Sequence, residues 1–140
     1  MKYLAVDFGI LRCGIAVTDS SGAIAFARKI LDRSEKKRFW REFLSLLELE
    51  APQAIVVGLP LRGDGSESQT TRQTRNFVKS LQRRLTLPVY LMEEMLSSYD
   101  ADALARETAS ARKNAPNDHI AAARILESFL NLPETRRIPA

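Results

Sequence analysis

The run Ala54-Ile55-Val56-Val57-Gly58 is the feature that most restricts what this chain can fold into. It shows no alternation of polar and apolar residues, so the strand that it predicts must be covered on both faces. Strands of this kind are typical of parallel sheets in α/β proteins, where helices lie on both sides of the sheet. The run therefore predicts an α/β fold, and we expect a helix to follow it.

Further strands are predicted by short apolar segments on either side of this run. The turn chemistry of Asp19-Ser20-Ser21-Gly22 predicts that two of these strands form an antiparallel hairpin near the start of the chain. The predicted strands cover residues 3–7, 13–18, 23–30 and 87–92.

Helices are predicted where apolar residues recur at three-to-four spacing. The first is expected to begin with Asp32 or Ser34 as its cap and to end before Pro52. The predicted helices cover residues 35–50, 68–85, 98–108 and 117–130. The order β-β-β-α-β-α-β-α-α then predicts a five-stranded mixed sheet with helices on both faces.

The size of the chain suits one globular domain. With 140 residues, 45% of them hydrophobic, we expect a single domain over residues 1–130. Residues 131–140 contain two prolines and two arginines and are expected to form a flexible tail. The formal charge of +4 modestly favours an anionic partner such as a nucleic acid.

The cysteine content and the hydropathy predict a cytoplasmic protein. Cys13 is the only cysteine, which excludes an intramolecular disulfide and a cysteine-based zinc site within one chain. The N-terminal apolar run is interrupted by Asp7, unlike a signal peptide, and no stretch approaches the roughly 20 apolar residues of a membrane span. We therefore expect no membrane partner.

Three acidic residues lie where strands are expected to end or a helix to begin. Asp7 ends the first strand, Glu94 follows the last strand, and Asp118 opens the last helix. Ligands bind beyond the carboxyl ends of strands in such sheets, so convergence of these side chains would form an oxygen-rich pocket for Mg²⁺ or Mn²⁺. Nucleases use such pockets to hydrolyse phosphodiesters.

Each of these acidic residues also has an ordinary structural interpretation. Asp7 could bond the amides of a turn, and Asp118 could cap its helix. Spacing does not decide between Glu93 and Glu94, because adjacent strand residues point to opposite faces. His119, the only histidine, could assist proton transfer or lie idle at the surface.

Glycines and basic residues near these acids are candidates for phosphate binding. Gly9 and Arg12 follow Asp7, and the segment 58–67 carries Arg62 among several glycines. We expect this segment to be a mobile loop whose amides and arginine bind a phosphate, although a plain surface loop would read the same way.

Basic residues further along the chain are more ambiguous. The pair Arg112 and Lys113 would add positive charge near the pocket. A stripe at helical spacing could follow a nucleic-acid backbone or simply face solvent. The stripe consists of Arg72, Arg75, Lys79 and Arg83.

Four sequence blocks, in order and with the right spacing, carry a resemblance to a known family. With them the chain resembles, over about residues 3–130, the YqgF-type proteins. These are small bacterial RNase H-like domains described as Holliday-junction resolvase homologues and as nucleases of pre-16S ribosomal RNA. The blocks are Val6-Asp7-Phe8-Gly9 with Arg12 and Gly14, Ile55–Leu61 with Gly63–Glu67, Glu93-Glu94 with Leu96-Ser97-Ser98, and Asp118 with Ala121-Ala122.

The resemblance implies an RNase H-like fold and a metal-dependent nuclease. Matched block by block, the family's catalytic, metal-binding carboxylates fall on Asp7, Glu94 and Asp118, which selects Glu94 over Glu93. They would hold two Mg²⁺ or Mn²⁺ ions. Substrate binding is expected from Gly9, Arg12, Arg62, Arg112 and Lys113.

The expected reaction is maturation of the 5′ end of pre-16S rRNA in ribosome biogenesis. The partners would be precursor rRNA and ribosomal particles, with the protein a monomer or weak homodimer. A Holliday junction resolvase acting on four-way DNA is one alternative. A resolvase cuts two strands symmetrically and needs a dimer, and no segment of the sequence indicates a dimer interface.

A non-catalytic nucleic-acid-binding factor in ribosome assembly or transcription is the other alternative. It is kept open by three departures from the family pattern. Ile10 replaces a threonine, Leu11 replaces one of a basic pair, and Met95 replaces the arginine after the catalytic glutamate. The loss of these polar and basic groups predicts weaker contact with substrate.

Overall fold

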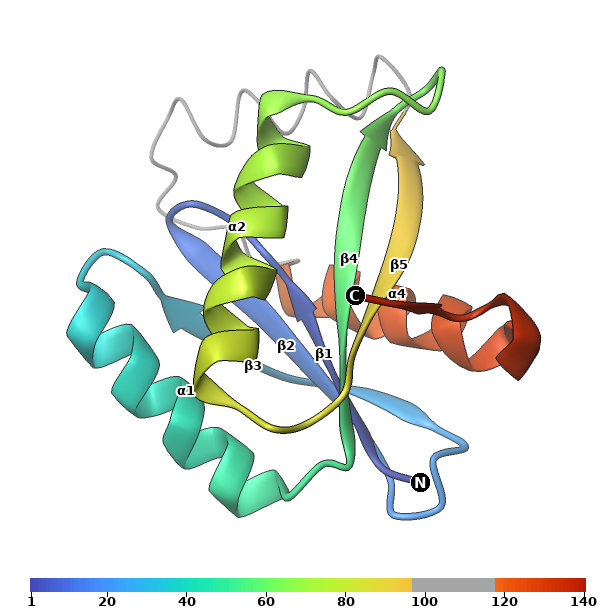
Figure 1. The fold of residues 1–140 in the computed structure, drawn as a ribbon. Coiled ribbons are helices and arrows are strands. Elements are labelled where there is room, and N and C mark those ends of the chain that lie inside the picture. The colour runs from blue at the N-terminus through green and yellow to red at the C-terminus, as the bar shows by residue number, and fades with distance from the viewer. Residues whose placement is uncertain (97–117) are drawn as a thin grey trace.

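The structure, a computed structural model, describes the backbone of residues 1–96 and 118–140. These residues form a six-stranded sheet in the order β3-β2-β1-β4-β5-β6 (Figure 1). The strands are β1 (Tyr3–Asp7), β2 (Arg12–Thr18), β3 (Ala25–Asp32), β4 (Ala54–Arg62), β5 (Val89–Leu96) and β6 (Ile138–Pro139). The helices are α1 (Lys36–Glu50), α2 (Gln69–Arg84) and α4 (Asp118–Asn131), with a short 3-10 turn, η1 (Glu134–Arg136).

The sheet is mixed, as the sequence predicted. β1 pairs antiparallel with β2, and β2 pairs antiparallel with β3, which confirms the predicted opening hairpin. β1 pairs in parallel with β4, and β4 pairs in parallel with β5. The carboxyl ends of β1, β4 and β5 therefore point the same way. The helix predicted over 98–108 lies outside the described residues.

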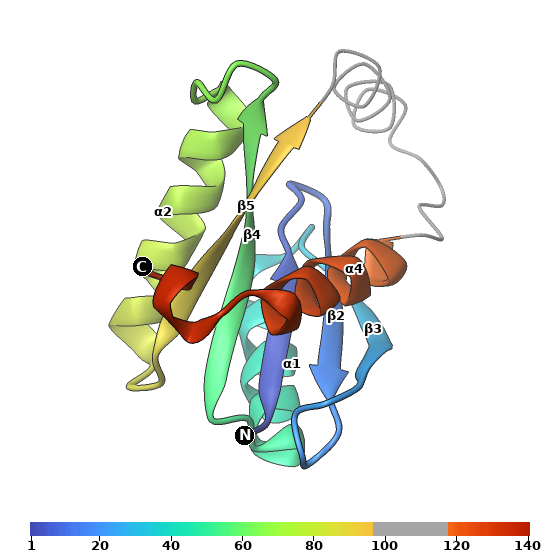
Figure 2. The ribbon, with the colours of Figure 1, turned by 90° about the vertical axis from the view of Figure 1, so that its right-hand side faces the viewer.

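Helices cover both faces of the sheet, which confirms the layered architecture (Figure 2). On one face, α1 and α2 pack against alternate residues of the central strands, including Leu4 and Val6 of β1. On the other face, α4 packs against the intervening residues, including Tyr3 and Ala5. The apolar run at 54–58 is buried because both layers contact it.

The start of α1 differs from the prediction. Its N-cap residue is Glu35, and no side chain bonds the free amides there. Asp32 instead accepts a hydrogen bond at Oδ1 from the amide of Ser34, 2.7 Å away, which forms a local turn before the helix. The expected cap by Asp32 or Ser34 is therefore wrong. The helix ends at Glu50, and Ala51 adopts a left-handed φ of 48° before Pro52.

Two strands run further than the sequence predicted. β4 continues to Arg62 and β5 to Leu96, and the two are in register from Ile55 opposite Val89 to Arg62 opposite Leu96. Mutual hydrogen bonding between these strands extends both of them past their apolar segments. The expected loop at 58–67 is consequently shorter, and Glu94 lies within a strand rather than after one.

In place of the flexible tail that the sequence predicted, the C-terminal residues add a sixth strand. β6 pairs antiparallel with β5, with Ile138 opposite Leu91. The guanidinium of Arg137 lies 4.5 Å from the ring centroid of Phe129, and its Nη1 donates to the hydroxyl of Tyr3 at 3.0 Å. A cation stacked on rings near the end of α4 and at the start of β1 fixes the tail to the core.

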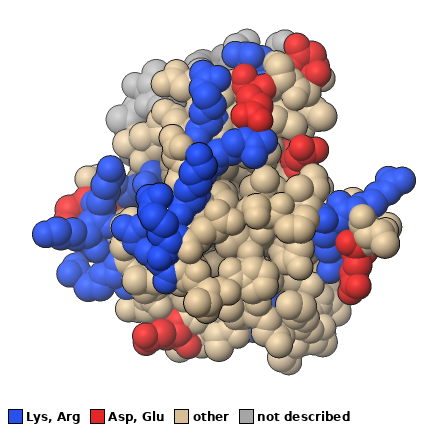
Figure 3. All heavy atoms as spheres, viewed as in Figure 1, with Lys and Arg blue, Asp and Glu red and all other residues tan. Residues whose placement is uncertain are grey.

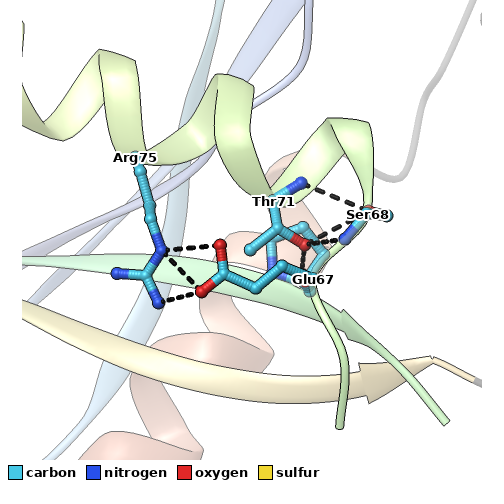
Figure 4. Close-up of polar contacts among 5 residues, drawn as sticks. Glu67, Ser68, Thr71 and Arg75 are labelled. Carbon is cyan, nitrogen blue, oxygen red and sulfur yellow. Dashed lines mark hydrogen bonds and ion pairs between the residues drawn. The ribbon is translucent and has the colours of Figure 1, made fainter. Parts of the chain in front are cut away.

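The start of α2 is held by side chains of its own first turn (Figure 4). Ser68 Oγ accepts from the amide of Thr71 at 3.2 Å, and Thr71 Oγ1 accepts from the amide of Ser68 at 2.9 Å. This reciprocal pair is a capping box.

Of the helices in the described part of the chain, none has the length and apolarity to cross a membrane.

Candidate active site

Asp7 is the last residue of β1 and lies on the sheet face that α4 covers. Side chains alternate along a strand, and Tyr3 and Ala5, four and two residues earlier, both pack in the cluster beneath α4. Asp7 shares their face and is half-buried. A carboxylate at this point ends the strand at the edge where α/β sheets bind ligands.

Glu94 lies on the same face of the sheet, two strands away. Tyr90 and Met92 of β5 pack against the α4 cluster, so alternation gives Glu94 the same face and Glu93 the opposite one. Glu93 is exposed, whereas Glu94 is partly buried. Spacing alone did not decide between Glu93 and Glu94. The position of Glu94 on the face of Asp7 is consistent with the family resemblance, which implied Glu94.

Gly58 separates these two acids and leaves room for Glu94. It follows Val57, which is in register with Val6, so it lies beside Asp7 on the intervening strand. A β-carbon on Gly58 would lie 3.1 Å from Glu94 Oε1 and 2.5 Å from Ile125 Cδ1 of α4. Any side chain at this position would have to displace Ile125 or Glu94. Sequence reasoning placed this glycine both at the end of the predicted strand 54–58 and at the start of the expected loop 58–67, and did not relate it to Glu94. Its position inside an apolar strand was the available signal, since such glycines often mark a close approach.

Burial raises the pKa of the Glu94 carboxyl above its ordinary value. The cause is desolvation, which disfavours the charged form. A cation near this carboxylate would oppose the shift by stabilising the charge. Two half-buried carboxylates on one face also provide the hard oxygen ligands that Mg²⁺ and Mn²⁺ prefer, so these residues fit such an ion.

The third predicted acid is described only in part. The backbone of Asp118 opens α4, the helix that covers this same face. The side chains of Asp118 and His119 lie outside the described residues, as do Arg112 and Lys113. Within the described side chains no group of three acids, histidines or cysteines could hold a metal ion. Asp7 and Glu94 are accordingly the two carboxylates whose placement supports the predicted site.

The turn after Asp7 has a structural need for glycine. A β-carbon on Gly9 would lie 2.5 Å from the carbonyl oxygen of Arg12, so a larger residue could not form this turn. Arg12 opens β2 and is half-buried. Its role in binding phosphate stays a prediction, and the turn that presents it is tightly built.

Arg33 supports this turn and was missed from the sequence. Its guanidinium lies 4.6 Å from the ring centroid of Phe8, and Nη1 donates to the carbonyl of Gly9 at 3.4 Å. Its backbone amide donates to the carbonyl of Leu11 at 2.8 Å. Nothing in the local sequence marked it, because the contacts join the end of β3 to the end of β1.

Arg62 has a different setting from the one expected. It ends β4, and its Nη1 donates to the carbonyl of Glu67 at 3.1 Å and to Ser66 Oγ at 3.3 Å. Ser66 also bonds Asp64 through its amide and its hydroxyl, which lowers the pKa of Asp64. The segment 62–67 is thus closed by its own hydrogen bonds. These contacts indicate an ordered turn rather than the mobile loop that we expected.

The end of this loop is tied to α2 (Figure 4). The guanidinium of Arg75 donates from Nη2 to Glu67 Oε2 at 2.7 Å and from Nε to both carboxylate oxygens. This bidentate ion pair is stronger than a single hydrogen bond between an arginine and a carboxylate. Arg75, expected in a basic stripe, is therefore partly neutralised.

Comparison with known proteins gives a family match. Residues 1–132 match the family described as "RuvX: Holliday junction resolvase". Two relatives named "Putative pre-16S rRNA nuclease" come from Nitratidesulfovibrio vulgaris (Miyazaki F) and Lawsonia intracellularis. The first is 51% identical and aligns over 100% of both chains. The second is 45% identical over 99% of both.

Solved structures share the fold at low sequence identity. The RuvC of Thermus thermophilus in complex with a Holliday junction substrate has a TM-score of 0.63 and 15% identity, covering 100% of this chain and 99% of that one. The fowlpox virus Holliday junction resolvase has a TM-score of 0.53 and 17% identity, covering 93% and 98%. The likeness to RuvC confirms the predicted RNase H-like fold.

Proposed function

Because the chain belongs to the RuvX family, we propose that it is a metal-dependent nuclease that hydrolyses phosphodiester bonds of precursor 16S rRNA. The relatives that align with the whole chain carry that activity in their names. The single observation that carries the proposal is the common face of Asp7 and Glu94, with Gly58 between them.

Asp7, Glu94 and Asp118 would hold the divalent ions. When bound, Mg²⁺ or Mn²⁺ would supply charge stabilisation to the phosphate undergoing attack and lower the pKa of the attacking water. The partial burial of Glu94 serves this role, because a desolvated carboxylate gains more from a cation than an exposed one does. Gly58 keeps the space in front of Glu94 free of a side chain.

The surrounding groups would position the substrate. Gly9 allows the backbone of the turn after Asp7 to approach a phosphate, and Arg12 at the start of β2 would pair with a neighbouring one. Arg33 holds this turn through the Gly9 and Leu11 carbonyls. Arg62, Arg112 and Lys113 would extend contact along the nucleic-acid strand.

A second candidate is cleavage of four-way DNA junctions. It is favoured by the description of the matching family as a Holliday junction resolvase. Symmetric cutting of a junction requires two active sites related by a two-fold axis. A weak homodimer would satisfy this requirement, whereas a monomer would favour the RNA substrate.

A binding role without catalysis is the third candidate. Ile10 and Met95, at 49% and 59% relative exposure, place apolar groups where the family has polar or basic ones. Such a surface would bind nucleic acid without the full set of phosphate contacts. Salt-sensitive binding without turnover would identify this function.

The deciding experiment compares the purified wild-type chain with Asp7→Asn. Each is incubated in Mg²⁺ or Mn²⁺ with labelled precursor 16S rRNA and, in parallel, with a four-way DNA junction. Cleavage of the RNA by the wild type alone supports the proposed function. Symmetric cutting of the junction supports the resolvase. Cleavage that persists in Asp7→Asn contradicts the proposed site.

A further inference from the structure

A basic surface lies on the sheet face opposite Asp7 and Glu94. Residues 36–41 of α1 and residues 69–84 of α2 contain nine lysines and arginines and no aspartate or glutamate. In space-filling view these side chains gather along α2 and reach the start of α1 (Figure 3). We call this surface the basic helix face. It consists of Lys36, Lys37, Arg38, Arg41, Arg72, Arg75, Lys79, Arg83 and Arg84.

The two helices form one continuous surface. The rings of Trp40 on α1 and Phe77 on α2 stack with centroids 5.7 Å apart. The guanidinium of Arg84, at the end of α2, lies 4.0 Å from the centroid of Trp40. These contacts join the start of α1 to the second half of α2, so the charges of both helices add to one field.

Most of this charge is uncompensated. Among the side chains that the structure describes, ion pairs engage Arg38 with Asp32 and Arg75 with Glu67, and no other member of the basic helix face. Arg72, Lys79 and Arg83 are all exposed. An ordinary solvated helix face mixes both signs of charge, whereas a surface of one sign attracts a polyanion.

The aromatic side chain on this surface is unsuited to stacking with unpaired bases. Proteins that bind single strands offer free aromatic rings to successive bases. Here Trp40 is partly buried, with Arg84 over its ring and Phe77 stacked against it. Contacts to phosphates remain, and these are independent of sequence. The chemistry fits the backbone of a base-paired stem.

The basic helix face begins at the end of the sheet that carries Asp7 and Glu94. α2 begins just after the loop at the carboxyl end of β4, the end toward which β1 and β5 also point. From Arg72 to Arg83 the helix rises about 16 Å. A stem bound along α2 would therefore extend from the end of the sheet that carries Asp7 and Glu94.

We propose that the basic helix face binds the phosphate backbone of a double-stranded nucleic acid, in the first place a stem of the RNA substrate, apart from the acidic site. This inference rests on the proposed function for the identity of the substrate. The binding itself requires no cleavage and can be measured separately.

The test uses the full chain carrying Arg72→Gln, Lys79→Gln and Arg83→Gln together, three residues outside the ion pairs. The matched control carries Lys29→Gln, Arg124→Gln and Arg136→Gln, three exposed basic residues elsewhere with the same change in net charge. Thermal unfolding first establishes that both variants fold. Binding of a 20-base-pair RNA duplex, a DNA duplex of the same sequence and the single RNA strand is then titrated at several salt concentrations without divalent ions.

We expect the α2 variant to lose about tenfold or more in affinity for the RNA duplex, and the slope of log affinity against log salt to fall by about two to three. The control should lose clearly less. Equal losses in the two variants, or no duplex binding by the wild type, would overturn the proposal. Stronger binding of the single strand than of the duplex would also overturn it. DNA binding as tight as RNA binding would support a backbone contact without preference between the two.

The outcome is separable from the proposed function. If the α2 variant loses duplex binding while the wild type cleaves no RNA, the proposed binding by the basic helix face is supported and the proposed nuclease function is contradicted. If the wild type cleaves RNA and both variants bind the duplex equally, the nuclease function is supported and binding by the basic helix face is contradicted. A second variant with Lys36→Gln, Lys37→Gln and Arg41→Gln should show a smaller loss of the same kind if α1 takes part.

Discussion

Glu94 and Gly58 lie on neighbouring strands, with Glu94 two residues beyond the register partner of Gly58, and one carboxylate oxygen of Glu94 lies 3.1 Å from where a β-carbon on the glycine would be. The same point is 2.5 Å from Cδ1 of Ile125, so helix, strand and carboxylate converge on a residue without a side chain. This relationship gives the candidate site its shape, because a side chain at residue 58 would have to displace Ile125 or the Glu94 carboxylate.

Gly58→Ala is expected to destabilise the protein and impair cleavage together. The added methyl group must displace Ile125 or Glu94, and such overpacking costs about 1–3 kcal/mol. Urea unfolding measures the loss of stability, and cleavage of labelled precursor rRNA measures the loss of activity. Gly63→Ala, at an exposed loop position without a positive φ, serves as the control. Wild-type stability in Gly58→Ala would contradict the packing described above.

Glu94→Gln and Glu93→Gln should differ sharply in activity. The first change removes a carboxylate on the face of Asp7, and we expect cleavage to fall by more than about 100-fold. The second removes an exposed carboxylate on the opposite face and should leave cleavage within about threefold of wild type. Single-turnover cleavage rates at saturating Mg²⁺ measure both. Equal losses would mean that strand alternation does not define the site.

Glu94→Gln should also stabilise the metal-free protein at neutral pH. Because burial raises the pKa of Glu94 in the folded state, the carboxyl is protonated in both folded and unfolded chains below its ordinary pKa of 4.5 and has no effect there. As the pH rises above that value, ionisation in the unfolded state comes first and lowers stability until the folded carboxyl also ionises. Thermal unfolding from pH 4 to pH 8 with a chelator present should therefore show a gain in Tm for Glu94→Gln that grows with pH.

Added Mg²⁺ or Mn²⁺ should reverse the order of these two proteins. An ion that binds only the folded state raises its stability, and the wild type retains the carboxylate that would hold it. We expect a metal-dependent rise in Tm at pH 8 for the wild type and a much smaller one for Glu94→Gln. An equal rise in both would place the ion elsewhere.

Arg137→Ala is expected to cost about 1–3 kcal/mol of stability, whereas Arg136→Ala should be nearly neutral. The two arginines are adjacent, but Arg137 lies over Phe129 and donates to Tyr3, while Arg136 is exposed. The expected cost combines a cation–π contact with a charged hydrogen bond to a phenol. Urea unfolding of the two variants provides the comparison. Equal stabilities would show that the C-terminal residues contribute little to the core.

Much of the architecture followed from local pattern. The apolar run at 54–58 indicated a strand covered on both faces, and helical periodicity located α1 and α2 to within one residue at each end. These features depend on which residues are apolar and on the spacing at which apolar residues recur. Both can be read directly from the sequence. Asp7 and the pair Glu93-Glu94 were found the same way, from their positions after apolar segments, and the family resemblance then selected Glu94.

The remaining features depend on which segments meet. Four features come from partners distant in the chain or from the path of the backbone. They are the extension of β4 and β5, the addition of β6, the closure of Arg62 onto its own loop and the support of the Gly9 turn by Arg33. The face shared by Asp7 and Glu94 likewise required the register of three strands. The sequence by itself determined which residues could form strands, helices and a carboxylate site, because those properties are local. The tertiary structure alone decided which of them meet, because strand pairing and helix packing bring together residues whose separation in sequence carries no information about their contact.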